Sequence, residues 1–286
     1  MQLEGFDYHR IQVADGVALN VAVRGTGSPV VLLHGFPQTH LMWRHVAADL
    51  ASDHTVICPD LRGYGDSDKP ADGYAKRTMA ADIVAAAHAL GHDRFALVGH
   101  DRGALVAIRA GLDHPDTITH LAPLDVLPTL DMWDVLHGTT AAVGFHLYLM
   151  AQPPGLPEAM IGAAPDTFFG HFLNLWAQNP DAIPQDVRTA YLTASRNAVD
   201  SIVADYRASA TIDVDHDQAD RAAGNQLRMP VTVLQQDWGA TLGYDAVGVW
   251  QAWAPDLHHV TVSCGHFMAE EAPAEVIKHL RELLTR

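Results

Sequence analysis

Cysteines and long apolar stretches are both scarce in this chain of 286 residues. No run of residues approaches the roughly 18 apolar positions that a membrane-spanning helix needs. Two cysteines, Cys58 and Cys264, are too few for a disulfide framework, and we expect two reduced thiols. The opening segment MQLEGFDYHRIQ has an early acidic residue and no apolar core, so it does not resemble a secretory signal. We therefore expect a cytoplasmic protein.

Basic charge is in short supply as well. Lys and Arg number 18 against 34 Asp and Glu, which gives a net charge of −16 with histidine neutral. A surface of this sign repels polyanions, so we expect neither a nucleic-acid partner nor a membrane partner. It also disfavours a small anionic substrate unless the binding site itself supplies positive charge. We expect a small-molecule substrate, and we leave the oligomeric state open, with a homodimer as one candidate.

Apolar segments alternate with helical segments through much of the chain. Tyr8–Ala14 and Val17–Arg24 flank Asp15-Gly16 and predict a hairpin. Further strands are predicted at Pro29–Leu33, Thr55–Cys58, Phe95–Val98, Ile118–Val126, Val231–Leu234 and His259–Val262. Helices are predicted at Leu41–Leu50, Arg77–Leu90, Arg102–Leu112, Tyr244–Ala254 and Ala274–Leu284. This alternation predicts an α/β protein with a mostly parallel sheet and helices on both of its faces.

The alternation stops between about residues 127 and 227. This segment has no convincing buried strand, is rich in Trp, Phe, Leu and Ala, and has turn signals at Pro153-Pro154-Gly155 and Asn179-Pro180. We predict a helical cap over 127–227, inserted into a core made of 1–126 and 228–286.

An acidic run inside this segment, Asp213, Asp215 and Asp217, has some likeness to a calcium loop. A loop of the EF-hand type starting at Asp213 requires glycine at its sixth position and glutamate at its twelfth, where the chain has Gln218 and Gly224. We reject a calcium site and interpret the run as a solvated segment. The sequence predicts no metal and no cofactor.

The segment with the most chemical content is Gly99-His100-Asp101-Arg102-Gly103, between a predicted strand and a predicted helix. This G-x-Nu-x-G frame describes a nucleophile elbow, in which a tight turn pushes out the central side chain. A carboxylate that attacks an sp³ carbon leaves an ester that water can cleave, whereas serine would leave an inert ether. Asp101 therefore favours displacement at a carbon bearing a halide or an epoxide oxygen. The alternative is that Asp101 only caps the helix.

Other segments, in the right order, support the catalytic interpretation. His34-Gly35-Phe36-Pro37 follows a strand where hydrolases of this architecture supply an oxyanion-hole amide, so we assign that role to the amides of Phe36 and Arg102. Cys264-Gly265-His266-Phe267 follows the last strand and supplies a candidate base. Nucleophile, acid and histidine in this order predict the α/β-hydrolase fold, with Asp101 as nucleophile and His266 as base.

Two residues compete for the role of the acid that orients His266. Asp125 ends the strand Ile118–Val126, and Asp237 lies just beyond the strand Val231–Leu234. Both positions can orient an imidazole in this architecture, and spacing alone does not choose between them.

The chain resembles the fluoroacetate and haloacetate dehalogenases of the α/β-hydrolase superfamily over nearly its whole length. The matching segments are Gly99–Gly103, Asp113-His114-Pro115-Asp116, Leu124–Thr129, Pro165–Phe169, Asp205-Tyr206-Arg207-Ala208 and Thr211-Ile212-Asp213. The resemblance implies the nucleophile Asp101, the base His266, the acid Asp125 in preference to Asp237, and a substrate-carboxylate clamp at Arg102. It further implies halide-cradling groups at His146 and Tyr206, and a pocket aromatic at Trp176.

Two positions depart from the family pattern. Leu105 stands where the family has a second carboxylate-binding arginine, and Leu147 stands where it has a tryptophan that helps to bind the halide. Hydrolytic dehalogenation of a short 2-haloacid is the function that the resemblance implies. Epoxide hydrolysis, with His146 and Tyr206 as proton donors, is the alternative that the two leucines favour. A non-hydrolytic ligand-binding protein or lyase on the same scaffold is a third hypothesis.

Overall fold

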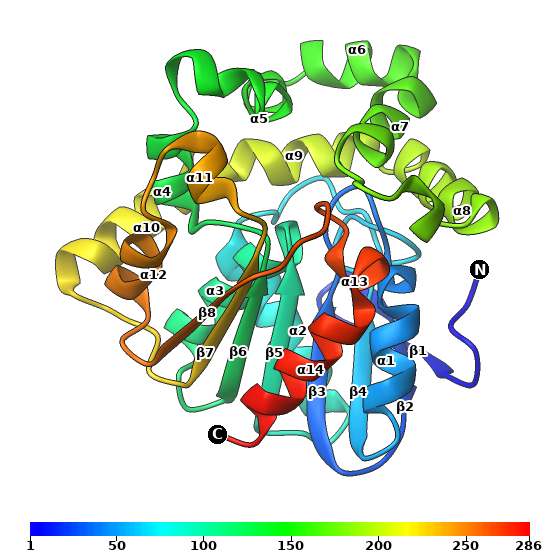
Figure 1. Cartoon of the computed structure of the whole chain (residues 1–286). Helices are drawn as coiled ribbons and strands as arrows, with labels where there is room; N and C mark the ends of the chain where they lie inside the picture. Colours follow the sequence, from blue (N-terminus) through cyan, green and yellow to red (C-terminus); the bar gives the residue numbers. More distant parts are fainter.

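A single eight-stranded sheet organises the molecule, shown in Figure 1 as a computed structural model that describes all 286 residues. Its strand order is β1-β2-β4-β3-β5-β6-β7-β8. The strands are β1 Asp7–Ala14, β2 Val17–Arg24, β3 Ser28–Leu33, β4 His54–Pro59, β5 Phe95–His100, β6 Ile118–Leu124, β7 Val231–Gln235 and β8 Leu257–Thr261. From β4 to β8 neighbouring strands are parallel, whereas β2 is antiparallel to both of its neighbours, β1 and β4. The predicted α/β-hydrolase fold class is confirmed.

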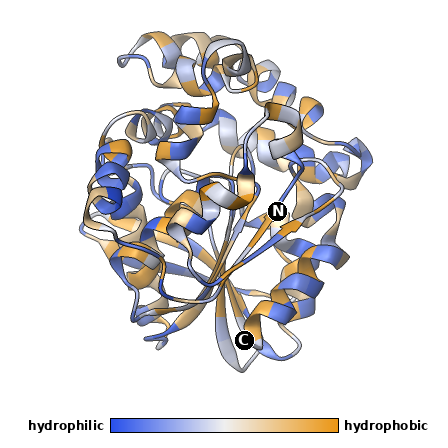
Figure 2. Ribbon diagram, turned by 60° about the vertical axis from the view of Figure 1, so that its left-hand side comes forward, coloured by the Kyte–Doolittle hydropathy of each residue, from blue (hydrophilic) through white to orange (hydrophobic).

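The two faces of the sheet are both apolar, as expected for parallel strands covered by helices. On β3, Val31 and Leu33 belong to one hydrophobic cluster, and Val30 and Leu32 to the other. The first cluster includes α2 (Lys76–Ala89), α3 (Arg102–Asp113) and α12 (Ala246–Trp253). The second includes α1 (Arg44–Leu50) and α14 (Pro273–Leu284). Figure 2 shows this as hydrophobic strands inside helices of mixed hydropathy.

Seven α-helices and no strand lie between β6 and β7. They are α4 Thr129–Val135, α5 Phe145–Met150, α6 Leu156–Ala163, α7 Pro165–Leu175, α8 Gln185–Arg196, α9 Val199–Ser209 and α10 Ile212–Ala223. In Figure 1, α5 to α9 cover the carboxyl ends of the parallel strands, while α10 descends beside α12. Arg221 of α10 stacks on the ring of Trp253, 4.9 Å from its centroid. The inserted segment therefore covers the carboxyl ends of the strands and, through α10, also packs against α12 of the core.

The interpretation of the acidic run as solvated holds for Asp215, which is exposed, and is wrong for the other two residues. Asp213 and Asp217 lie in α10 and are only 2% and 6% exposed. The amide of Lys76 donates to Asp213 at 2.8 Å, and Arg109 binds Asp217 at 2.7 Å. Both cations come from the core, more than 100 residues earlier in the sequence, so the run joins the inserted segment to the core.

Two helices begin later than predicted for local reasons. The segment Leu41–Leu50 opens as a 3₁₀ turn over His40–Trp43 before α1 starts. The segment Tyr244–Ala254 becomes helical only at Ala246, because Asp245 caps α12 by accepting from the amide of Gly248.

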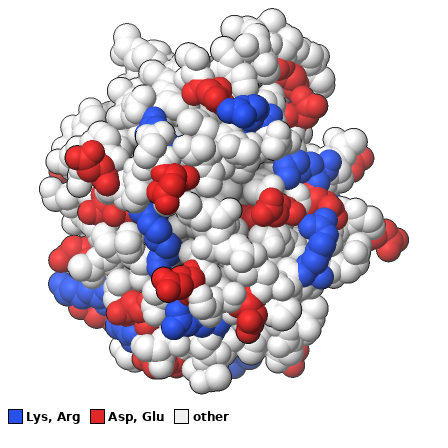
Figure 3. Space-filling model, turned by 90° about the vertical axis from the view of Figure 1, so that its right-hand side faces the viewer, with Lys and Arg blue, Asp and Glu red and all other residues white.

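Acidic and basic side chains intermingle on the face shown in Figure 3. Arg281, for example, binds both Asp49 and Asp53. The net charge of −16 is therefore not gathered into a single acidic patch on this face. None of the helices is long and apolar enough to cross a membrane.

Candidate active site

Asp101 occupies the tight turn between β5 and α3, with φ of 50° and ψ of −117°. This conformation is rare for a residue with a side chain and persists only where the surroundings enforce it. A Cβ on Gly99 would lie 2.3 Å from the carbonyl oxygen of Gly103, and one on Gly103 would lie 2.4 Å from that of His34. Both glycines are thus required by the close packing of backbones that holds Asp101 in place.

Backbone amides hold the carboxylate of Asp101. The amide of Phe36 donates to Oδ1 at 2.7 Å. Gly35 permits this approach, because a Cβ there would lie 2.5 Å from the Cβ of Asp101. Burial raises the pKa of Asp101 above its ordinary value, while His266, Arg102 and the amides of Phe36 and Arg102 oppose that rise. Two amides placed in this way also fit the oxyanion of a tetrahedral intermediate formed on Asp101.

His266 follows β8 and lies between two carboxylates. Its Nδ1 is 2.6 Å from Oδ2 of Asp125. Its Nε2 is 3.9 Å from Oδ2 of Asp101, too far for a hydrogen bond, and it has no partner within the protein. Burial lowers the pKa of His266, but Asp125 and Asp101 outweigh burial and leave the pKa raised. A proton on Nδ1 is held by Asp125, which leaves Nε2 able to accept another.

Asp125 is itself fixed from several sides. It follows β6 with φ of 51°, which turns its side chain toward His266. Its carboxylate accepts from the amide and side chain of Gln236, at 2.9 and 2.6 Å, and from Nε1 of Trp238 at 3.0 Å. The sequence analysis missed Gln236 and Trp238, although a polar run directly after a buried strand was the available signal.

Asp237, the other candidate acid, does not contact His266. It caps α11 (Trp238–Leu242), where its Oδ1 accepts from the amide of Ala240 at 3.1 Å. Asp237 thus has the turn-capping role that its position after β7 also permitted.

Five aromatic side chains of the inserted segment surround the ring of Phe36, and three of them are the residues predicted to line the pocket; the other two are Phe169 and Phe172. His146 of α5 is stacked on it at 6.0 Å between centroids, Trp176 at the end of α7 lies edge-on at 6.0 Å, and Tyr206 of α9 lies edge-on at 5.3 Å. Trp176 also contacts the imidazole of His266 at 4.9 Å. The structure therefore brings together all three of the residues that the sequence assigns to this side of the pocket.

Two polar atoms of this aromatic group form no hydrogen bond within the protein. The hydroxyl of Tyr206 and Nδ1 of His146 are buried without a hydrogen-bond partner. Burial, together with Arg102, lowers the pKa of His146 to about 3. Burial, followed by the nearby Asp101, raises the pKa of Tyr206 well above its ordinary value. At neutral pH both side chains are uncharged, so the Tyr206 phenol carries a transferable proton and the neutral imidazole of His146 can donate a hydrogen bond.

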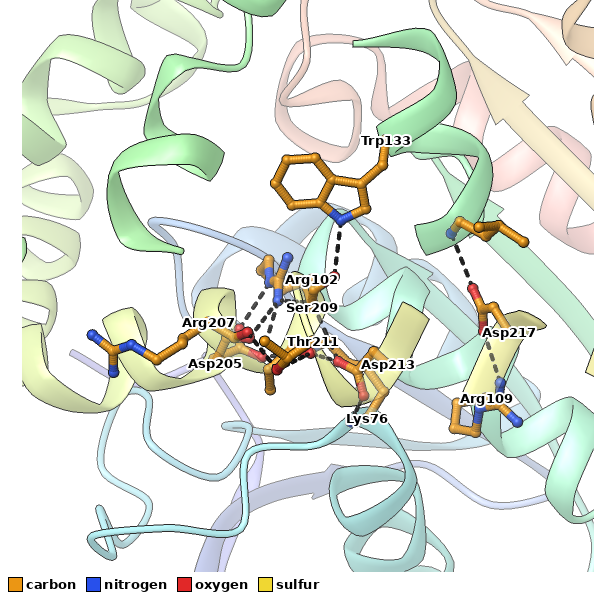
Figure 4. Close-up of polar contacts among 12 residues, drawn as sticks. Lys76, Arg102, Arg109, Trp133, Asp205, Arg207, Ser209, Thr211, Asp213 and Asp217 are labelled. Carbon is orange, nitrogen blue, oxygen red and sulfur yellow. Dashed lines mark hydrogen bonds and ion pairs between the residues drawn. The ribbon is translucent and has the colours of Figure 1, made fainter. Parts of the chain in front are cut away.

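Arg102, which the resemblance assigns as a clamp for a substrate carboxylate, is paired with a carboxylate of the protein itself (Figure 4). Its Nε and Nη2 bind Asp205 at 2.8 and 3.1 Å, and Nη2 also donates to Ser209 at 2.6 Å. The guanidinium is 4.0 Å from the centroid of the Tyr206 ring. Its counter-charge lies 103 residues away in the sequence, so neighbouring residues gave no sign of it.

These residues line a cavity of about 130 Å³ beneath the inserted helices. Its lining includes the polar side chains of Asp101, Asp125, His266, His146 and Tyr206. The only lysine or arginine side chain in this lining is Arg102. Much of the remaining wall is aliphatic and is formed by Leu105, Val126, Leu127, Met132, Val135, Leu136, Val143, Leu147 and Leu242. Leu105 and Leu147, the two departures from the dehalogenase pattern, thus both face the cavity.

A deep elbow, an amide-bound carboxylate and an Asp-supported histidine under a helical roof define a hydrolase site. The model of the alpha/beta hydrolase fold family matches residues 28–273, and the chain belongs to this family. The chain is therefore an enzyme of the α/β-hydrolase class, as the sequence predicted.

The named relatives include both a dehalogenase and an epoxide hydrolase. The chain is 38% identical to fluoroacetate dehalogenase of Burkholderia sp, over 99% of this chain and 95% of that protein. It is 33% identical to soluble epoxide hydrolase of Corynebacterium sp. (strain C12), over 94% of each. The solved structure of ALR0039, a putative alpha/beta hydrolase from Nostoc sp PCC 7120, matches it with a TM-score of 0.95 at 36% identity, covering all of both chains. The predicted resemblance is confirmed, and the choice of substrate depends on the site.

Proposed function

We propose that this protein hydrolyses a small, uncharged epoxide through a covalent ester on Asp101. The observation that carries this choice is the pair of unpartnered donors, the Tyr206 hydroxyl and His146, in a cavity whose one cation is already bound by Asp205. An opening epoxide leaves an alkoxide that must be protonated in place, and a buried neutral phenol supplies that proton. An apolar wall accepts the rest of such a substrate without burying a charge.

The first step forms the ester. The Asp101 carboxylate attacks a ring carbon, the bond between that carbon and the epoxide oxygen breaks, and the oxygen takes a proton from Tyr206. The neutral imidazole of His146 beside it can donate a hydrogen bond to the same oxygen. The hydroxyalkyl group is then held as an ester of Asp101.

The second step cleaves the ester with water. Nε2 of His266 takes a proton from water, and the resulting hydroxide attacks Cγ of Asp101. The amides of Phe36 and Arg102 stabilise the oxyanion that forms. Collapse of this intermediate releases the diol and regenerates the Asp101 carboxylate, and the proton held by His266 returns by way of solvent to the Tyr206 phenolate. The sum is one epoxide and one water converted to one diol.

Hydrolytic dehalogenation of a short 2-haloacid is the second candidate. It is favoured by the similarity to fluoroacetate dehalogenase and by the same two donors, which can also bind a departing halide. Here Asp101 would displace halide directly, and the ester would carry a carboxylate.

Mass spectrometry of a His266→Gln variant separates these reactions. Without the base the ester accumulates, and an epoxide adds its whole mass to Asp101, whereas a haloacid adds its mass less that of the hydrogen halide. We expect the epoxide adduct with simple terminal epoxides and little adduct with chloroacetate or bromoacetate. The reverse pattern would establish the dehalogenase, and a wild-type assay for diol and for free halide checks either result.

A further inference from the structure

Glu271 ends α13 (Met268–Glu271), the short helix that begins two residues after His266. Its carboxylate accepts hydrogen bonds from four backbone amides. Two of these amides flank His266, and the other two follow α7 in the inserted segment. The donors are Gly265 at 3.3 Å, Phe267 at 3.2 Å, and Gln178 and Asn179, both at 2.8 Å. One carboxylate therefore ties the turn that carries the base to the inserted segment.

The two segments also contact each other directly. The amide of His266 donates to the carbonyl oxygen of Trp176 at 2.8 Å, and the indole of Trp176 lies 4.9 Å from the imidazole between ring centroids. Gly265 permits this approach, because a Cβ there would lie 2.6 Å from the carbonyl oxygen of Trp176 and would also collide with the amide of Gln178. The backbone position of His266 is thus set from the side of the inserted segment as well as from the sheet.

The ring of His266 is held at one nitrogen only. Nδ1 is bound by Asp125, whereas Nε2 has no partner within the protein and is 3.9 Å from Oδ2 of Asp101. Asp125 fixes how the ring is turned, but the place of the ring depends on the backbone that carries it. A displacement of about 1 Å in such a group can slow a reaction about a hundredfold. Glu271 opposes that displacement, because it binds the amides on either side of His266.

Glu271 also acts on the charge state of His266. Burial lowers the pKa of His266, Asp125 and Asp101 raise it, and Glu271 adds a smaller rise in the same direction. Removal of the negative charge of Glu271 should therefore lower this pKa. A loosened turn that weakens the contact with Asp125 should lower the pKa further, so both effects have the same sign.

We propose that Glu271 is a positioning residue for hydrolysis of the ester, because it clamps the turn of His266 to the end of α7. Glu271 is not part of the cavity wall and acts only through His266. Since His266 takes no part in the attack of Asp101 on the substrate, the role of Glu271 is confined to the second step of the reaction. The proposal rests on the proposed function in taking an ester of Asp101 as the intermediate, whichever substrate class forms it.

Glu271→Gln tests the clamp with little change of shape. The amide nitrogen that replaces one carboxylate oxygen is a donor and cannot accept from the backbone amides that it would face. Single-turnover mass spectrometry follows the formation and loss of the ester, with the terminal epoxide or the bromoacetate that leaves an adduct on His266→Gln. We expect hydrolysis to slow by about tenfold or more, and ester formation to stay within about twofold of the wild type. A smaller loss in hydrolysis, or an equal loss in both steps, overturns the proposal.

Two further variants make the result specific. Glu275→Gln is the matched control, because Glu275 is an exposed residue of α14 that pairs with Lys278 and His279 of its own helix. It should leave both rates within about twofold, and a slowing like that of Glu271→Gln would overturn the specific role of Glu271. Glu271→Asp keeps the charge but is one methylene shorter, so it cannot reach all four amides, and it serves if Glu271→Gln does not fold. It should also slow hydrolysis alone, and hydrolysis at the wild-type rate overturns the proposal.

Titration of the His266 imidazole by NMR requires no turnover. The imidazole is assigned as the resonance that is lost in His266→Gln. Its midpoint should lie at lower pH in Glu271→Gln than in the wild type, and Glu275→Gln should leave it unchanged. Equal midpoints in Glu271→Gln and the wild type overturn the proposal.

The two measurements separate this proposal from the proposed function. If neither substrate class leaves an ester on His266→Gln, the proposed function fails, and the NMR titration still decides the role of Glu271. If the ester forms, but Glu271→Gln neither slows its hydrolysis nor shifts the midpoint, the role of Glu271 fails and the proposed function stands.

Discussion

The two walls of the active site are held in different ways. On the core side, Asp101 and Asp125 both have a positive φ. The amide of Phe36 binds Oδ1 of Asp101, and both carboxylate oxygens of Asp125 accept hydrogen bonds. On the side of the inserted helices, His146 and Tyr206 are held by aromatic packing, and their polar atoms have no partner within the protein. In the proposed mechanism the core wall carries out the bond-forming and bond-breaking steps, and the other wall supplies a proton donor and shapes the cavity. Variants on each wall test this division.

The largest effect is expected from Asp101→Asn. The amide is a poor nucleophile, so no ester forms, and turnover of any substrate should fall by at least about a thousandfold. Initial rates of diol and halide formation measure this loss. Turnover within tenfold of the wild type would exclude a covalent mechanism through Asp101.

Asp125→Asn should come next, with kcat reduced by about a thousandfold or more, because His266 loses the anion that orients its ring. Asp237→Asn is the matched control on the neighbouring strand and should lose no more than about threefold, since Asp237 only caps α11. Similar losses in both variants would show that the observed pairing of His266 does not govern the reaction.

A smaller loss is expected on the opposite wall. Tyr206→Phe removes the proton donor and should lower the rate of ester formation from epoxides by about a hundredfold. Tyr244→Phe is the control, because Tyr244 also lines the cavity, but its hydroxyl accepts from the side chain of Gln235 and its neighbouring carboxylates are Asp125 and Asp237 rather than the nucleophile. Single-turnover trapping of the ester measures both. If Tyr206→Phe forms the ester at the wild-type rate, Tyr206 is not the donor.

The mildest change is a shift in pH dependence. His266 accepts a proton only when neutral, so kcat limited by ester hydrolysis falls as pH drops through its pKa. In the free enzyme Asp125 and Asp101 raise that pKa above its ordinary value. In the ester Asp101 carries no charge, so Asp125 is the main carboxylate that still raises the pKa, and Asp125→Asn should move the acidic limb to lower pH. A profile of kcat against pH at saturating substrate tests this, with Asp237→Asn expected to superpose on the wild type. A limb that stays at the same pH in Asp125→Asn would contradict this role of Asp125.

The core wall was the more predictable of the two. The spacing Gly99-x-Asp101-x-Gly103 already indicates a tight turn, because side chains at the two glycines would collide with neighbouring backbone. The position of His266 directly after a strand is the one this fold gives to its catalytic histidine. The choice between Asp125 and Asp237 was not available from spacing, because both follow adjacent strands. It is made by the φ of 51° at Asp125 and by Gln236 and Trp238, which are contacts of the folded chain.

The environment of Arg102 was the least predictable feature. A charged residue beside a nucleophile suggests a substrate contact, and only the packing of α9 against α3 supplies Asp205 as its partner. The same reason explains the error at Asp213 and Asp217, whose cations Lys76 and Arg109 come from helices of the core. The sequence shows which residues are charged. Pairing with residues far away in the sequence decides whether such a charge is free to bind a ligand or to face solvent.

The strands β6 and β7 are neighbours in the sheet, where Leu124 pairs with Leu234. In the sequence, however, all of the inserted helices separate these two strands. Folding must therefore close one very large loop before the sheet is complete. Closure entropy grows only with the logarithm of loop length, so doubling such a loop opposes folding by only about 0.6 kcal/mol. The same core can accordingly accept a longer, shorter or borrowed set of helices at this junction. Grafting this segment between relatives is thus a practical route to new substrates, provided that the receiving core has partners for Asp205 like Lys76 of α2 and Arg102 of α3.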